Sequence, residues 1–228
     1  MPVIVTFDVF SALTDSRTGG SAFLQDIAGR YGWPVDGSAI YDRWDATNKE
    51  RHRAVQGWVP FAELSAVAMS SALSSLGLPD DSADSTSAEL LGSMVDWPLW
   101  PDVTAQALQR IGAAGLGLLS NIDDALLADT AVMRLGVFDP ALVVTSERAR
   151  AYKPAAALYA KATELLGPFV HVASSARDVR GAVSAGIRCI RLQRAGHSLD
   201  ASGPTPRWTV DSITALGDAL AAAEESDA

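Results

Sequence analysis

Four groups of residues with chemically useful side chains each follow an apolar run that predicts a buried strand. They are Asp8 after 3–7, Ser120 and Asn121 after 116–119, Lys153 after 142–144, and Ser174, Ser175 and Asp178 after 169–172. Ligands of open α/β sheets bind beyond the carboxyl ends of the strands, so we expect these side chains to converge on one crevice. A carboxylate beside an ammonium group stays ionised and is a candidate nucleophile.

The elements that must position these groups alternate between strands and helices. Helical runs at 103–113, 126–135, 155–166, 179–185 and 213–223 follow or separate the strand runs, the last of which spans 188–192. Strands joined by helices through short loops predict the α/β class, with a Rossmann-like, doubly wound parallel sheet.

The stretch from 16 to 97 breaks this alternation, because its pattern is helical throughout. Helices are expected near 21–31, 40–55, 61–76 and 89–95, with an Asp- and Ser-rich loop at 79–87. Since the block follows the first strand directly, we expect it to form a cap above the carboxyl edge of the sheet. The predicted domains are a Rossmann-like core of residues 1–15 and 98–228 and a helical cap of residues 16–97.

Composition narrows the class of partner. Hydrophobic residues make up 48% of the chain and charged residues 20%, which is typical of a globular protein with a substantial core. The formal net charge of -9 argues against nucleic acid and against an anionic membrane surface, so we expect a small-molecule partner. The single cysteine, Cys189, cannot form an internal disulfide, and no secretory signal or membrane-spanning run is recognisable, so we expect a cytoplasmic location. A homodimer is left open.

Four short motifs follow one another along the chain. They are 6–13 (TFDVFSAL), 119–121 (LSN), Lys153–Pro154 with Tyr159 six residues past the lysine, and 172–178 (VASSARD). In this order they resemble the four motifs of the haloacid dehalogenase (HAD) superfamily. The resemblance covers nearly the whole chain and is weakest in the predicted cap.

Two positions distinguish between branches of that superfamily. The phosphatase branch has a second aspartate where Phe10 stands and an Mg²⁺-binding aspartate where Ser174 stands. The branch of the L-2-haloacid dehalogenases has an aromatic residue at the first position and needs no metal. The resemblance therefore implies no required cofactor, although weak Mg²⁺ binding by Asp8 and Asp178 is left open.

Resemblance to the L-2-haloacid dehalogenases also implies roles for the motif residues. Asp8 attacks the halogen-bearing carbon of a 2-haloacid, the halide leaves, and water hydrolyses the aspartyl ester. Lys153 keeps Asp8 ionised, and Asp178 orients Lys153 or the water. The remaining motif residues bind the substrate or support its pocket: Phe10, Ser11, Ser120, Asn121, Tyr159, Ser174 and Ser175.

Departures from the family pattern keep other functions open. Ser11 and Ala12 replace a Gly-Thr pair, Ser175 replaces an asparagine, and Asp45 stands near the position of the family's halide-binding arginine. A carboxylate there repels halide, so Arg17 or Arg43 is the expected replacement. The alternatives are a diverged or non-catalytic protein of this fold and a Mg-dependent small-molecule phosphatase.

Overall fold

Six parallel strands form the centre of the molecule in the computed structural model, which describes residues 3–199 and 202–225. The strand order is β3-β2-β1-β4-β5-β6. The strands are β1 Ile4–Phe7, β2 Gly115–Ser120, β3 Val143–Thr145, β4 Phe169–Ala173, β5 Arg188–Leu192 and β6 Trp208–Val210. The predicted α/β class with a parallel sheet is confirmed.

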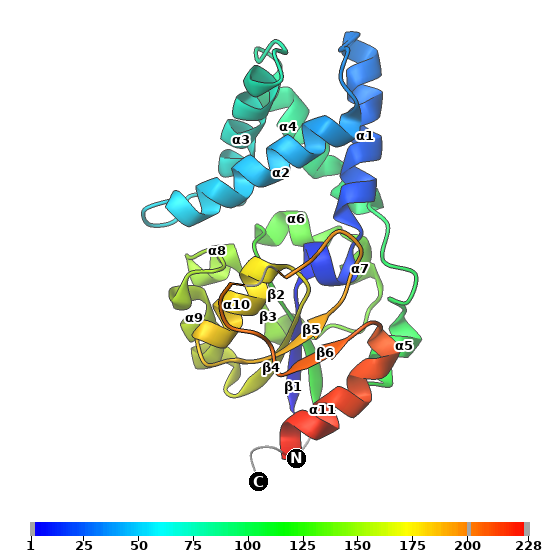
Figure 1. Ribbon diagram of the computed structural model, residues 1–228, viewed down its shortest axis with the longest axis vertical. Coiled ribbons are helices and arrows are strands. Elements are labelled where there is room, and N and C mark those ends of the chain that lie inside the picture. Colours follow the sequence, from blue (N-terminus) through cyan, green and yellow to red (C-terminus); the bar gives the residue numbers. More distant parts are fainter. Residues whose placement is uncertain (1–2, 200–201, 226–228) are drawn as a thin grey trace.

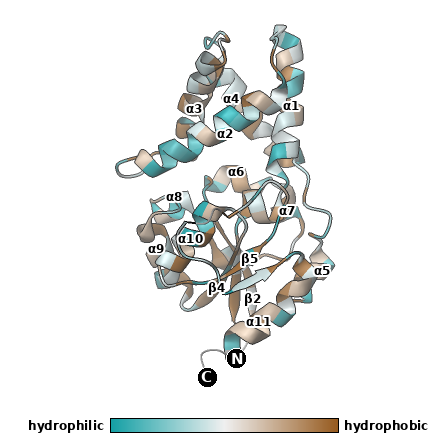
Figure 2. Cartoon of the chain, in the orientation of Figure 1, coloured by the Kyte–Doolittle hydropathy of each residue, from teal (hydrophilic) through white to brown (hydrophobic). Residues whose placement is uncertain are grey.

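Both faces of the sheet are covered by helices, which explains why the central strands are almost wholly apolar. Successive residues of β1 point to opposite faces: Val5 and Phe7 pack with α5, α6, α7 and α11, while Ile4 packs against the cluster of α9 and α10. Figure 2 shows hydrophobic colour in the centre of the sheet. The helices are α5 Ala105–Gln109, α6 Asp124–Ala128, α7 Ala131–Arg134, α8 Ser146–Ala149, α9 Ala156–Leu166, α10 Ala176–Ser184 and α11 Leu216–Glu225.

Four helices between β1 and β2 form a second layer, which we call the helical insertion (residues 16–97). They are α1 Ser16–Tyr31, α2 Gly37–Ala54, α3 Phe61–Ser75 and α4 Ala83–Gly92. They lie together at one end of the molecule, with α2 crossing above the sheet (Figure 1). They bury an apolar cluster of their own, which includes Leu24, Ile40 and Leu73.

Gly37 permits the close crossing of α1 and α2. A Cβ atom at this position would lie 2.2 Å from the backbone nitrogen of Gln25. The Gly37 N–H instead donates to Gln25 Oε1 at 2.8 Å. Any larger residue would therefore separate the two helices that carry much of the cavity wall described below.

The two connections between the sheet and the insertion run side by side. Asp15 N–H donates to Pro98 O at 2.9 Å, and Trp100 N–H donates to Leu13 O at 3.0 Å. These contacts lie where the sequence places the boundaries of the core and the cap. The division into two domains stays a prediction, and residues 1–2, 200–201 and 226–228 of the predicted core lie outside the described residues.

Several element boundaries differ from the predicted ones because side-chain caps interrupt the apolar pattern. The predicted helix 126–135 is two helices, α6 and α7, since Thr130 caps the second by accepting from Met133 N. The predicted helix 103–113 is only α5, which Thr104 begins. Helix α4 starts within the stretch expected to be a loop, and β6 is a strand that the sequence pattern did not predict.

No helix in the described residues has both the length and the apolar composition needed to cross a membrane.

Candidate active site

Asp8 lies at the carboxyl end of β1, where the chain turns into a short π-helix, Val9–Leu13. Its Oδ2 caps that turn by accepting from the Ser11 hydroxyl at 2.6 Å and from the Ser11 N–H at 3.2 Å. Its Oδ1 accepts from Lys153 Nζ at 2.7 Å. The carboxylate is therefore held at both oxygens by hydrogen-bond donors, one of them charged. In the altered first motif, where Ser11 and Ala12 replace a Gly-Thr pair, the Ser11 hydroxyl contacts Asp8.

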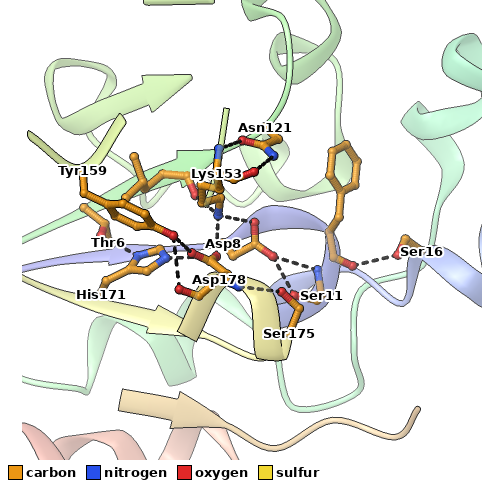
Figure 3. A network of polar contacts seen from close by, with 12 residues as sticks. Thr6, Asp8, Ser11, Ser16, Asn121, Lys153, Tyr159, His171, Ser175 and Asp178 are labelled. Atoms are coloured by element: carbon orange, nitrogen blue, oxygen red, sulfur yellow. Dashed lines mark hydrogen bonds and ion pairs between the residues drawn. The ribbon is translucent and has the colours of Figure 1, made fainter. Parts of the chain in front are cut away.

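Lys153 uses all three of its ammonium protons in buried hydrogen bonds (Figure 3). Nζ donates to Asp8 Oδ1 and Leu119 O at 2.7 Å each, and to Asp178 Oδ2 at 2.5 Å. Burial alone would lower the pKa of Lys153, but the two carboxylates outweigh it and raise the pKa above its ordinary value. The side chain is thus a fixed cation between two anions.

Asp178, in the first turn of α10, anchors the far side of this network. Its Oδ1 accepts from Tyr159 Oη at 2.8 Å, and its Oδ2 also contacts His171 Nε2 at 3.1 Å. Burial opposes ionisation, but Lys153 and His171 together hold the pKa of Asp178 well below its ordinary value. Thr6 Oγ1 contacts His171 Nδ1 at 2.9 Å and fixes the ring from behind. A carboxylate with so low a pKa is a weak base, so this geometry favours the positioning of Lys153 over proton abstraction.

The side chain of Asn121 holds the backbone of Lys153 in place. Its Oδ1 accepts from Lys153 N at 2.7 Å, and its Nδ2 donates to Lys153 O at 3.1 Å. This paired contact fixes the start of the Lys153 side chain, while Leu119 O holds its far end. Both residues come from the end of β2, so one strand terminus orients the lysine at two points.

A cavity of about 490 Å³ opens above this network, between the sheet edge and the helical insertion. This volume is in the range of pockets that hold drug-sized ligands. Phe10 stacks on Phe61 of α3, with ring centroids 6.0 Å apart, and so joins the two sides of the wall. The predicted site residues that line the cavity are Asp8, Phe10, Ser11, Arg17, Asn121, Lys153, Ser175 and Asp178.

Four predicted substrate-binding residues do not line the cavity. Ser120 and Ser174 are fully buried at the ends of β2 and β4, and their hydroxyls have no hydrogen-bond partner among the described residues. Tyr159 lies behind Asp178, where it supports that carboxylate. Arg43 is exposed, because its neighbour Trp44 takes the inward face of α2. For these four, packing places the side chain away from the space that a substrate would enter.

The charged residues on the insertion side of the cavity are paired with each other. Arg17 forms a two-point contact with Asp42, both bonds at 2.8 Å. Asp45, expected to repel a halide, accepts from Lys49 Nζ at 2.5 Å, so its charge is largely balanced. Both pairs are partly exposed.

Arg177 is a cavity cation that sequence reasoning missed. It lies in the first turn of α10, and its Nη1 donates to Lys49 O at 2.8 Å. Because this partner is a neutral carbonyl, the guanidinium charge is not cancelled there. The sequence did contain a signal for Arg177, because it lies in the fourth motif, one residue before Asp178.

The arrangement does not fit a Mg²⁺ ion between Asp8 and Asp178. The Lys153 ammonium lies between those two carboxylates and contacts both. The described residues contain no cluster of three or more His, Cys, Asp or Glu side chains that suits a metal ion. Ser174, at the position of a metal-binding aspartate in the phosphatase branch, has no charge to add.

Comparison with known proteins identifies the fold. No family model and no curated protein matches the sequence. The solved L-2-haloacid dehalogenase of Xanthobacter autotrophicus with covalently bound chloropropionic acid is 22% identical, with a TM-score of 0.80 over 97% of this chain and 99% of that chain. A defluorinating L-2-haloacid dehalogenase is 25% identical, with a TM-score of 0.79 over 96% of this chain and 95% of that chain.

The site and these similarities define the class: an α/β chain with the HAD fold and an aspartate–lysine–aspartate network at the carboxyl edge of its sheet. Within that class, the fold is the one found in L-2-haloacid dehalogenases, as the sequence motifs predicted.

Proposed function

We propose that this chain is a HAD-type hydrolase that cleaves the carbon–halogen bond of a small 2-haloacid through an aspartyl ester at Asp8. The observation that carries the proposal is the position of the Asp8 carboxylate and the donors that hold it. Its carboxylate lies in a ligand-sized cavity with Lys153 on one oxygen and Ser11 on the other. These contacts hold the carboxylate in one orientation, which is what direct attack on carbon needs.

In the first step, a lone pair of an Asp8 oxygen forms a bond to C2 of the substrate. The carbon–halogen bond breaks, and the halide leaves with its electron pair. A halide needs no proton to leave, so Phe10 in place of a general acid does not hinder this step. Arg177 is our candidate for the cation that stabilises the departing halide or the substrate carboxylate, because among the described residues its guanidinium pairs with a backbone carbonyl and with no carboxylate.

In the second step, water attacks the carbonyl carbon of the ester. The bond between that carbon and the oxygen now attached to C2 breaks, and this oxygen, which came from Asp8, leaves with the product after taking one proton of the water. The water oxygen stays in the carboxylate, and the second proton passes to solvent. The products are a 2-hydroxy acid and the regenerated Asp8 carboxylate. Negative charge that develops on the Asp8 oxygens during this step is stabilised by Lys153 Nζ and by the Ser11 donors already in place.

Halide release from 2-chloropropanoate tests the proposal. We expect release that is insensitive to a chelator, is abolished in Asp8→Asn, and persists in Asp26→Asn, a matched change on the exposed face of α1. A mass increase of the Asp8 peptide during turnover would identify the ester. Phosphate release from an aryl phosphate only with Mg²⁺ would favour the phosphatase alternative instead. Release of neither ion across a broad panel would favour a non-catalytic protein.

A further inference from the structure

Two uncharged polar residues of α2 line the cavity and carry buried atoms that have no hydrogen-bond partner in the described part of the chain. Asn48 and His52 are one helical turn apart, are 4% and 7% exposed, and both line the cavity. Asn48 Oδ1 and both ring nitrogens of His52 have no partner among the described residues. Buried polar atoms are normally paired, so three unpaired atoms on one cavity wall indicate a place for a ligand group.

The His52 ring is held in position by aromatic packing. It stacks on Tyr152, with ring centroids 4.3 Å apart and an interplanar angle of 5°, and it also contacts Phe61 at 5.4 Å. Tyr152 directly precedes Lys153, and Phe61 stacks on Phe10. His52 is therefore connected on both sides to the residues next to the Asp8–Lys153 pair.

His52 is neutral in this environment. Burial, together with the nearby positive charges of Arg177 and Lys49, lowers its pKa to about 3. A neutral imidazole has one N–H donor and one acceptor nitrogen. The unpaired atoms of this wall therefore include an acceptor at Asn48 Oδ1 and a donor at one ring nitrogen of His52, beside the second, accepting ring nitrogen.

We infer that Asn48 and His52 form a subsite for a primary carboxamide group of the substrate. A carboxamide can donate an N–H to Asn48 Oδ1 and accept at its oxygen from the His52 N–H, which pairs one unpaired atom of each residue. A carboxylate has no proton to donate to Asn48 Oδ1, and a ketone supplies only an acceptor. The inference rests on the proposed function, because it assigns this group to the molecule that Asp8 attacks.

Binding of three unreactive probes of similar shape tests the subsite without turnover. The probes are butanamide, butanoate and pentan-2-one, titrated into the wild-type chain and followed by NMR. We expect butanamide to bind about five- to tenfold more tightly than either of the others, since each unmatched buried hydrogen bond lowers affinity by about this factor. Equal affinities for butanamide and pentan-2-one, or tighter binding of butanoate, would overturn the inference.

Two variants and a control sharpen the test. His52→Phe keeps the stacking on Tyr152 and removes both nitrogens, and Asn48→Leu keeps the volume and removes the amide. Each should abolish the preference for butanamide, whereas Glu50→Gln, exposed on the same helix, should retain it. A preference that survives in both variants would overturn the inference. Halide release is measured separately, so an absence of turnover would count against the proposed function while the binding data still decide the subsite.

Discussion

On the sheet side of the cavity, the ion pairs of Lys153 join side chains that are at most 10% exposed. On the insertion side, the side chains of the Lys49–Asp45 and Arg17–Asp42 pairs are 33–59% exposed. Buried charges interact strongly but depend on every partner being present, whereas exposed pairs contribute little and exchange readily with water. The sheet side is thus suited to hold one reactive geometry, and the insertion side to accommodate a ligand.

Replacing Lys153 on the sheet side and Lys49 on the insertion side by methionine measures this contrast directly. Lys153→Met leaves two buried carboxylates without their shared cation, and we expect a loss of about 3–5 kcal/mol in the free energy of unfolding together with loss of halide release. Lys49→Met, the matched change on the insertion side, should cost about 0–1 kcal/mol. Urea denaturation of both variants checks the difference. Similar losses in the two variants would contradict the comparison.

The pH dependence of stability should come from the sheet side. The pKa of Asp178 is lowered from 3.8, so its contribution is present above that pH and is lost as the pH falls through the lowered value. The pKa of Lys153 is raised from 10.5, so its contribution is complete below that pH and is lost as the pH rises through the raised value. In Lys153→Met the burial of Asp178 is no longer opposed by Lys153, so the variant loses stability as the pH rises above about 4, and we expect its stability difference from wild type to grow there and to shrink again above about pH 10. A difference that stays constant from about pH 4 to pH 10 would show that other groups dominate.

Tyr159→Phe probes the support behind Asp178. The change removes the hydroxyl that donates to Asp178 Oδ1 and leaves a buried carboxylate oxygen unpaired, so we expect a loss of about 1–3 kcal/mol. Because one donor to the ionised form is gone, the pKa of Asp178 should also rise, and the acid limb of the stability profile should move to higher pH. Tyr31→Phe, at an exposed ring on α1, is the control and should leave both quantities unchanged.

The smallest expected effect concerns the contact between the two sides. Asp123, next to α6, caps α3 of the insertion by accepting from Phe61 N at 2.8 Å and Ala62 N at 3.0 Å. Asp123→Ala should cost about 1 kcal/mol, as should Thr104→Ala, which removes the cap of α5 on the sheet side. Only the first should increase amide hydrogen exchange at the start of α3. Equal exchange in both variants would show that Asp123 does not fasten the insertion.

Much of the fold was predictable because it follows from local pattern. The apolar runs before Asp8, Ser120 and Ser174 are strands, and the alternation with helices predicted a parallel sheet. Boundaries failed where a single capping side chain interrupts the pattern, as Thr130 does between α6 and α7. The short edge strand β6 has too few residues to show a periodicity of its own.

The candidate site was predictable in part. Motif order placed Asp8, Lys153 and Asp178 in one crevice, and the structure brings them into contact. The order of the motifs gave no sign that Arg43 faces outward or that Asn48 and His52 face inward. These orientations depend on which face of α2 the other helices cover. His171 was passed over because a histidine within a strand is unremarkable until Thr6 and Asp178 lie on its two nitrogens.

By itself, the order of residues along the chain determined which chemical groups stand at the ends of the strands, since a parallel sheet brings all its carboxyl ends to one edge. Tertiary structure alone decided which of those groups reach the cavity and in what state of charge. Ionisation and exposure depend on neighbours distant in sequence: Lys153 lies 145 residues from Asp8, and only packing makes them a pair.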